Sequence, residues 1–288
     1  MVDQAPLSQL QPLSMQKPVK HQSIVGADEP RILVDYLALK LGESKAMLKR
    51  ALTQGCCQIK RKNYKGLKRV RRSKFDLFAG DRVEFNYDPN LVPADTSGCR
   101  VLYEESSFGI WFKPAGVLSQ GTKWGDEGSI IRHIEKEKPH VHLIHRLDFE
   151  TSGVMVFSYT DKAAEKLSRL WQGKSVEKIY LAEVLGDIEG DEGQIELDID
   201  GKYCRTHWRV LERLGDITRV EAKLATGRKH QIRIHFEAFG HPVIGDPKYG
   251  KGNKNREGLR LQAYRLAYDC PMSKKRVNIC VPDELKLF

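Results

Sequence analysis

Apolar positions recur at helical spacing near the start of the chain. Between residues 31 and 41, Leu33, Tyr36 and Leu37 lie three or four positions apart, and Gly42 follows. This spacing places apolar side chains on one helix face, and glycine is typical of the position after a helix end. We predict one short amphipathic helix in this segment.

A second helix and a closing strand follow at short intervals. Ser44 is a suitable N-cap for a helix with an apolar face that ends before Gly55. Further on, Val83, Phe85 and Tyr87 alternate with polar residues in AGDRVEFNYD, the pattern of a half-buried strand. These elements predict a small α/β domain over residues 31–90.

The C-terminal two thirds of the chain alternates strand-like runs with turns, and only two helical patterns interrupt them. We predict helices at 161–172 and 229–238 and strands at 100–104, 109–113, 153–158, 178–185, 194–198, 207–211 and 218–224. Because no regular β-α-β alternation is visible, we predict an α+β domain with a mixed, largely antiparallel sheet over residues 100–288.

Two further segments complete the predicted organisation. Residues 1–30 contain many glutamines and prolines and little apolar periodicity, and we interpret them as a flexible arm. Residues 91–99 belong to a Pro- and Gly-containing stretch that we interpret as a linker between the domains.

Composition and charge indicate the kind of partner. The 288 residues carry 48 Lys and Arg against 38 Asp and Glu, a net charge of +10, and such surfaces attract polyphosphate backbones. The chain has no apolar run near the ~20 residues that span a bilayer, and its six cysteines are scattered. We therefore expect a cytoplasmic, monomeric protein with a nucleic-acid partner, no membrane contact and neither zinc nor disulfides.

The densest positive charge lies between residues 60 and 74, where more than half of the positions are Lys or Arg. A solvated loop would also carry such charge, but its place beside a helix pair favours phosphate contact. Residues 31–87 resemble the S-four RNA-binding domain, whose second helix and adjoining loop bind RNA backbone. The resemblance implies RNA contacts for Lys45, Lys49, Arg50, Lys60, Arg61, Lys68, Arg69, Arg71 and Arg72.

A first candidate for chemistry is the segment HRLDFETSG, residues 145–153. In it Asp148 lies near an arginine and hydroxyl side chains, which can keep a carboxylate ionised as a nucleophile or base requires. Structural salt bridges produce the same pattern, so this segment alone leaves both interpretations open.

A second candidate is ATGRKHQIRIHFEAFGHPVIGDPKYG, residues 225–250. Its predicted helix carries several polar residues, and those three or four apart share a face: Arg228, His230, Gln231, Arg233 and His235. The interleaved arginines would repel a metal cation and no cysteine ligand accompanies the histidines, so we predict anion or RNA contact and no metal site.

These two segments, together with KPAG at 113–116 and KIYLAEV at 178–184, resemble in order and spacing the four sequence blocks of the RluA-type pseudouridine synthases. The resemblance covers residues 100–268. It implies that Asp148 is the catalytic aspartate, that Tyr180 packs on the uracil and assists loss of the carbon-five proton, and that Arg233 pairs with the aspartate. Arg146 is implied to fill the gap left by a flipped nucleotide, and further RNA contacts are expected from Lys113, His145, Arg228, His230 and Gln231.

These roles agree with elementary chemistry. A stacked base must leave its helix before it can be turned over, and a planar guanidinium replaces lost stacking. A desolvated carboxylate needs a positive partner, and the sequence offers Arg233 as a single one. Isomerisation requires no redox carrier or hydrolytic metal, so we expect no cofactor. Lys229, Phe112 and Gln262 depart from the common family pattern and leave the choice of RNA position open.

Other functions are compatible with parts of the sequence. Asp148 and Glu150 could serve as the paired carboxylates of a glycosidase, although the basic charge does not suit a neutral sugar. A non-catalytic RNA chaperone is a second alternative. Within the resemblance, structured ribosomal RNA is favoured over transfer RNA because an S-four appendage is usual in relatives that act there.

Overall fold

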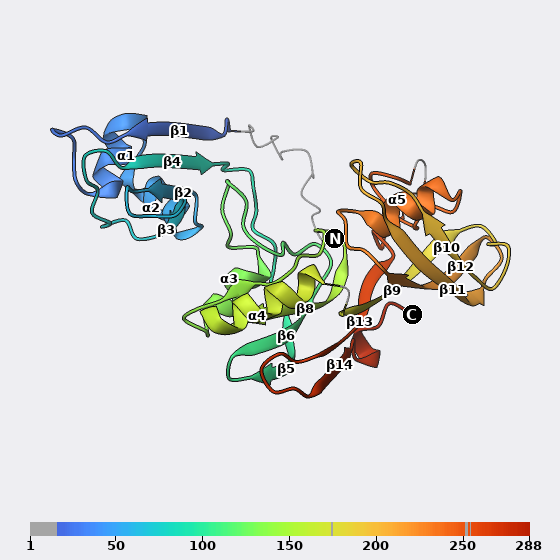
Figure 1. Cartoon of the computed structure of the whole chain (residues 1–288). Helices are drawn as coiled ribbons and strands as arrows, with labels where there is room; N and C mark the ends of the chain where they lie inside the picture. The colour runs from blue at the N-terminus through green and yellow to red at the C-terminus, as the bar shows by residue number, and fades with distance from the viewer. Residues whose placement is uncertain (1–15, 174, 251–252, 254) are drawn as a thin grey trace, which may run out of the picture. The chain divides into compact units, whose positions relative to one another are not determined.

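The computed structural model describes residues 16–173, 175–250, 253 and 255–288. This part of the chain divides into two compact units (Figure 1). The first extends to Pro93 and includes Thr122–Asp126, and the second comprises Ala94–Gly121 and Glu127–Phe288. The chain passes from the first unit to the second inside the predicted linker, and the short segment Thr122–Asp126 belongs to the first unit although it follows later in sequence.

The first unit is a four-stranded antiparallel sheet with two helices. The sheet order is β1-β4-β2-β3. Its elements are β1 (Val19–Ile24), α1 (Leu33–Leu41), α2 (Lys45–Thr53), β2 (Cys57–Lys60), β3 (Lys68–Val70) and β4 (Arg82–Tyr87). Ser44 caps α2 by accepting a hydrogen bond from the Met47 amide, and Gly42 ends α1 at φ 67°, as the sequence predicts. The assignment of this unit to the S-four family stays a prediction.

The predicted flexible arm is wrong for its described part, because Val19–Ile24 forms the edge strand β1. The sequence of this strand does not alternate between apolar and polar residues, because the inward positions beside Val19 are occupied by the polar residues His21 and Ser23. The Ser23 hydroxyl lies 2.6 Å from the Tyr36 hydroxyl, which satisfies both polar groups in the interior. Residues 1–15 of the predicted arm lie outside the described residues.

The second unit contains one ten-stranded sheet in the order β10-β11-β12-β9-β13-β8-β6-β5, with β14 also paired to β13 and β7 to β8. Its strands are β5 (Arg100–Glu105), β6 (Phe108–Lys113), β7 (His142–Leu143), β8 (Ser152–Ser158), β9 (Glu177–Leu185), β10 (Glu192–Glu196), β11 (Arg205–Arg213), β12 (Ile217–Leu224), β13 (Leu261–Asp269) and β14 (Arg276–Cys280). Among these described strands, only β8 and β13 pair in parallel. The predicted α+β class and its mixed, largely antiparallel sheet are confirmed.

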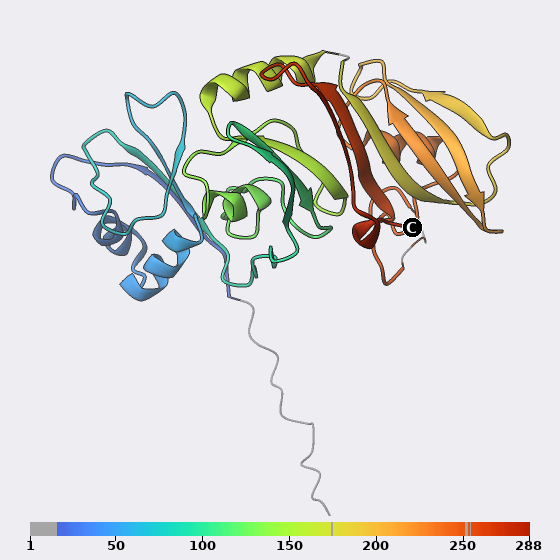
Figure 2. The ribbon, with the colours of Figure 1, turned by 90° about the horizontal axis from the view of Figure 1, so that it is seen from below.

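Three helices and a 3-10 turn complete the described part of the second unit: α3 (Ile130–Glu135), α4 (Asp161–Gln172), α5 (Gln231–Ala238) and η1 (Asp283–Leu285). Helix α5 packs Ile232 and Phe236 against apolar residues of β9, β11 and β12. Figure 2 shows β13 between the green strands β5, β6 and β8 and the yellow to orange strands β9–β12. Among the described residues, no helix is long and apolar enough to cross a membrane.

The parallel contact between β8 and β13 depends on Gly153, the last residue of HRLDFETSG. Gly153 has φ 126°, and a β-carbon built on it would lie 2.2 Å from the Ala263 carbonyl oxygen. Any side chain would therefore separate these two strands. The glycine holds the loop that precedes β8, residues 145–151, close to the centre of the sheet.

Candidate active site

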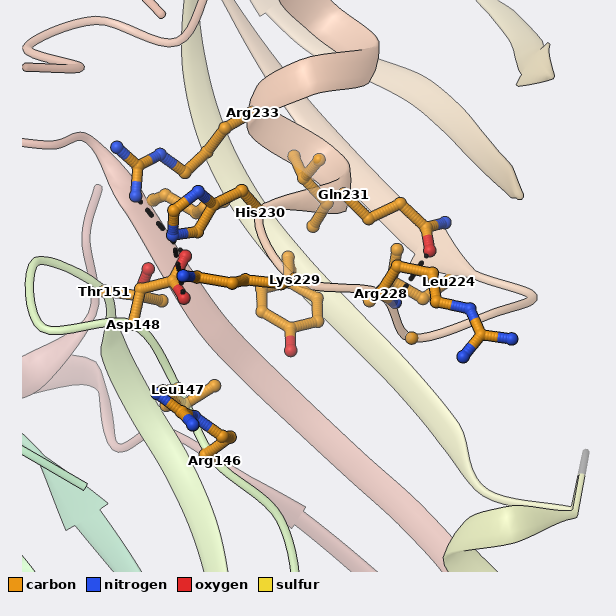
Figure 3. Close-up of a pocket in the computed structure, with 14 residues that line it drawn as sticks. Arg146, Leu147, Asp148, Thr151, Leu224, Arg228, Lys229, His230, Gln231 and Arg233 are labelled. Carbon is orange, nitrogen blue, oxygen red and sulfur yellow. Dashed lines mark hydrogen bonds and ion pairs between the residues drawn. The ribbon is translucent and has the colours of Figure 1, made fainter. Parts of the chain in front are cut away.

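One cavity of the second unit gathers side chains from both chemical segments of the sequence. We call it the candidate pocket; it is lined by Arg146, Leu147, Asp148, Thr151, Tyr180, Leu224, Gly227, Arg228, Lys229, His230, Gln231, Ile232, Arg233 and Leu261. The 145–151 loop forms one wall, and the turn before α5 with the first turn of α5 forms the opposite wall (Figure 3). Tyr180 of β9 also lines the candidate pocket.

Asp148 faces two nitrogen groups across the candidate pocket. Its carboxylate lies 3.4 Å from Nη1 of Arg233 and 3.4 Å from Nε2 of His230. The side chain is 19% exposed, so a ligand can reach it. Arg233 is the positive partner that the sequence offered, and the imidazole of His230 approaches the same carboxylate as a second nitrogen group.

Arg233 is held in place by a second carboxylate. Its Nε and Nη2 donate to the Asp246 carboxylate at 2.7 and 2.8 Å, and its Nη1 also lies 3.5 Å from Glu150. Burial opposes ionisation of Asp246, but hydrogen bonds from Arg233 and from the amides of Tyr249 and Lys248 hold its pKa below the usual value. This two-point pair leaves one guanidinium nitrogen directed at Asp148.

His230 is fixed by its backbone and by Tyr249. It precedes α5 in the left-handed conformation, at φ 57°, and its Nδ1 lies 2.9 Å from the Tyr249 hydroxyl. Burial lowers the pKa of His230, although Asp148 acts in the opposite direction. A neutral imidazole accepts at one nitrogen and donates at the other, so the tautomer with hydrogen on Nε2 can donate toward Asp148.

Two buried side chains hold the backbone on either side of Asp148. The Ser119 hydroxyl donates to the Leu147 carbonyl at 2.7 Å and accepts from the Leu147 amide at 3.0 Å. The Lys113 ammonium donates to the carbonyl of Phe149 at 3.3 Å and to that of Val117 at 2.8 Å. Because both neighbours of Asp148 are held, the loop presents its carboxylate in one position.

Tyr180 lines the candidate pocket from β9 and is partly buried. Burial raises the pKa of its hydroxyl, and the nearby negative charge of Asp148 raises it further. The phenol is therefore protonated at neutral pH. It combines an apolar ring with a polar tip inside the pocket.

Three residues expected to contact RNA are instead engaged inside the protein. Lys113 is fully buried, and burial lowers its pKa to about 8. His145 stacks on Trp171 with ring centroids 5.0 Å apart, and its Nε2 accepts a hydrogen bond from the Val156 amide. Gln231 is 2% exposed and bonds to Thr206, Thr226 and the backbone at Arg205 and Arg228. The polar atoms of these side chains bind other groups of the protein. The three residues therefore stabilise the structure around the site.

Arg146 and Arg228 are exposed at the candidate pocket, as a role in RNA contact requires. Figure 3 shows Arg146 on the side of Asp148 away from Arg233, and Arg228 extending from the turn before α5. Their roles stay predictions.

In the first unit the predicted RNA-binding residues differ in accessibility. Six of them are exposed: Lys45, Lys49, Arg50, Lys60, Lys68 and Arg72. Arg61 instead binds the buried Asp81 at 2.7 Å, Arg69 donates to the carbonyls of Gly55 and Thr122, and Arg71 pairs with Asp126. The intramolecular bonds of these three arginines make them poorer candidates for phosphate contact than the exposed six.

Sequence reasoning missed Asp246, Ser119 and Tyr249 as parts of the site. Asp246 stands in the motif GDPKYG, and Gly245 before it has φ 70°, with a built β-carbon 1.9 Å from the Gly258 carbonyl oxygen. The glycine followed by an aspartate in this motif is the sequence feature that could have indicated a tight turn carrying a carboxylate of the site. Among the described residues, no cluster of histidine, cysteine, aspartate or glutamate is arranged to hold a metal ion.

Comparisons with known proteins identify the family of this chain. The family of RNA pseudouridylate synthases matches residues 108–238. An uncharacterized RNA pseudouridine synthase of Bacillus subtilis is 38% identical over 73% of this chain and 78% of its own length. The ribosomal large subunit pseudouridine synthase D of Nitrosomonas europaea is 34% identical over 55% of this chain and 52% of its own length.

A solved structure is similar to this chain in its fold as well as in its sequence. The human RNA pseudouridylate synthase domain containing 1 matches with a TM-score of 0.57 and 27% identity, over 67% of this chain and 86% of that one. The fold and these comparisons together define an isomerase that acts on RNA. The chain belongs to the RNA pseudouridylate synthase family, and its resemblance to the RluA-type enzymes is confirmed. Its reaction is the conversion of uridine to pseudouridine in RNA.

Proposed function

We propose that this enzyme isomerises uridine in structured ribosomal RNA, with Asp148 as its catalytic carboxylate. The observation that carries the assignment is the position of Asp148 in the candidate pocket, 3.4 Å from an arginine whose other nitrogens are bound to Asp246. A carboxylate in such a position is oriented by its neighbours and reachable by a ligand.

The reaction breaks the bond between the ribose and N1 of uracil and forms a bond to carbon five of the same base. Asp148 attacks or stabilises the nucleoside while the base is detached. The base then turns within the candidate pocket and rejoins through carbon five, which loses its proton, while N1 gains one. No electrons enter or leave, so the atoms balance without a redox partner.

Tyr180 supports the detached base. Its ring, which lines the candidate pocket, offers a flat apolar face on which uracil packs and turns, and its hydroxyl assists removal of the carbon-five proton. The raised pKa keeps this hydroxyl protonated before substrate binds, so the proton must leave through a hydrogen-bonded relay or solvent. Tyr180→Phe keeps the packing face and removes the relay, and we expect it to lower kcat more than it raises KM.

Arg146 replaces the stacking that the RNA loses when the uridine leaves its helix. It is exposed at the rim of the candidate pocket, and a guanidinium plane stacks on neighbouring bases after the uridine has left. Truncation to alanine should weaken productive binding of a folded stem-loop more than that of an unstructured strand, in which little stacking is lost.

Ribosomal RNA is proposed as the substrate on two grounds. The exposed basic residues of the first unit suit an extended RNA backbone, and a relative that is 34% identical is a ribosomal large subunit synthase. Transfer RNA is the alternative class of structured substrate.

Chemical mapping of pseudouridine in ribosomal and transfer RNA decides between them. RNA from cells with the gene, without it, and with Asp148→Asn should be compared. We expect one or more ribosomal positions to lose pseudouridine both in the deletion and in the Asp148→Asn strain. Loss confined to transfer RNA would overturn the substrate, and full modification in the Asp148→Asn strain would overturn the catalytic residue.

A further inference from the structure

Lys178 lies beside the candidate pocket on the same strand as Tyr180. The two residues are two positions apart in β9, so their side chains leave the same face of the sheet. The Lys178 ammonium reaches the turn before α5, because a β-carbon built on Gly227 would lie 3.7 Å from its Nζ. Gly227 itself lines the candidate pocket.

The Lys178 ammonium has no anionic partner among the residues that the structure describes. None of their carboxylates forms an ion pair with it, and burial lowers its pKa with no compensating charge. Lys223 of the neighbouring strand differs, since its Nζ binds Glu177 at 2.8 Å. A partly buried cation without a partner is costly to keep, and an anionic ligand removes that cost.

A second cavity surrounds Lys178 and is rich in positive charge. Its lining includes Lys178, His207, Lys223 and Arg276, with Glu177 as the one acidic residue. It shares Leu224 with the candidate pocket. Figure 3 shows Leu224 at the end of the candidate pocket near Arg228, away from the pair of Asp148 and Arg233.

We propose that Lys178 and this second cavity form a subsite for a backbone phosphate next to the flipped uridine. The proposal rests on the proposed function, since it takes the uracil to lie between Asp148 and Tyr180. The phosphodiester groups on either side of that nucleotide must then leave the candidate pocket along its walls. The Leu224 end carries the Lys178 ammonium, and the absence of a side chain at Gly227 leaves that ammonium uncovered.

A phosphate fits this subsite better than a protein carboxylate would. An ammonium is a compact charge that binds phosphate oxygens from many directions, and the phosphate arrives covalently attached to the nucleotide in the pocket. Lys178 is therefore a binding and positioning residue. Its contribution should appear in RNA affinity and in the salt dependence of that affinity.

The test uses full-length protein that carries Asp148→Asn, so that RNA is bound without turnover. The probe is a stem-loop RNA with one uridine in its loop, made with an uncharged methylphosphonate on the 5′ or the 3′ side of that uridine. Fluorescence anisotropy gives the affinity of the parent, of Lys178→Met, and of Lys202→Met, an exposed control outside both cavities.

We expect Lys178→Met to weaken binding on the order of tenfold and to reduce the slope of log affinity against log salt by about 0.7. One methylphosphonate should weaken the parent and the Lys202→Met control by a similar factor and leave Lys178→Met unaffected, because both changes remove the same interaction. A merely structural role of Lys178 would not produce this coupling.

Two results would overturn the subsite. Lys178→Met could bind unmodified RNA as tightly as the parent, or it could lose as much affinity as the parent from both methylphosphonates. Turnover by the wild-type enzyme on its mapped RNA is measured separately. An enzyme without turnover would contradict the proposed function, while the coupling measured by anisotropy still decides whether the phosphate is bound by Lys178.

Discussion

Arg233 and Asp246 form a two-point ion pair in which the arginine side chain is 2% exposed and the aspartate is fully buried. Nε and Nη2 of Arg233 bind Asp246, and its third nitrogen, Nη1, lies 3.4 Å from the Asp148 carboxylate. Asp246 therefore determines the orientation in which Arg233 meets the proposed catalytic carboxylate, although it does not line the candidate pocket.

Asp246→Asn should reduce both activity and stability. The amide keeps the shape of the side chain but leaves the Arg233 charge without its buried counterion, which typically costs about 3–5 kcal/mol in unfolding free energy. We expect kcat to fall at least on the order of tenfold, with a smaller change in KM, because the guanidinium loses its fixed orientation. Steady-state kinetics and urea unfolding measure the two effects.

Asp269→Asn is the matched control for that substitution. Asp269 is 77% exposed and pairs only at 3.5 Å with Arg276, so its loss should change neither kcat nor the unfolding free energy by a measurable amount. A wild-type kcat in Asp246→Asn would show that the orientation of Arg233 does not depend on this pair.

Ser119→Ala should loosen the loop that carries Asp148. The substitution removes the hydroxyl that bonds both the amide and the carbonyl of Leu147, and leaving such buried groups unpaired costs about 1–3 kcal/mol. We expect a lower kcat with nearly unchanged RNA affinity. Kinetics of Ser106→Ala, at an exposed position, provide the comparison, and equal kcat values in the two variants would refute the role of Ser119.

Lys113 should make stability depend on pH in the alkaline range. Burial lowers its pKa from 10.5 to about 8 in the folded protein, so between these values the unfolded chain binds more protons. The free energy of unfolding therefore gains a contribution that rises with pH across this range. Lys113→Met should lack that rise, and a pH series of urea unfolding on both proteins measures it. Parallel pH profiles would contradict the low pKa.

The exposed basic residues of the first unit should contribute salt-dependent affinity without affecting chemistry. Replacing Lys49, Lys68 and Arg72 by glutamine removes three exposed charges, and each phosphate that is no longer neutralised reduces the salt slope by about 0.7–0.9. We expect weaker binding of long ribosomal fragments and unchanged single-turnover rates at saturating enzyme. Arg61→Gln breaks the pair with Asp81, so it should destabilise the unit instead. An unchanged salt slope in the triple variant would contradict RNA binding by this surface.

The main elements of the fold were predictable because periodicity and end signals agreed locally. Ser44 and Gly42 marked the helix ends correctly, and the strands around HRLDFETSG followed from apolar runs. Strand β1 was not predictable, since its inward positions carry His21 and Ser23, whose polarity is satisfied only by tertiary contacts such as that of Ser23 with Tyr36.

The sequence indicated candidate site residues from the chemistry of each side chain, but it did not indicate which residues bind them in the folded protein. Asp148 and Arg233 stand in separate segments that a family resemblance connects. The partners Asp246 and Ser119 depend on a turn and a loop whose meeting is a property of the folded chain. Lys113 shows the converse error, because a lysine in a sequence motif suggests phosphate contact until its burial is known.

A single-turnover assay of Asp148→Asn on the mapped ribosomal stem-loop tests the central claim most directly. The asparagine preserves the size of the side chain and removes the charge that faces Arg233 and His230. We expect no pseudouridine from a folded variant that binds the RNA nearly as tightly as the wild type. Formation of pseudouridine at the wild-type rate would contradict it.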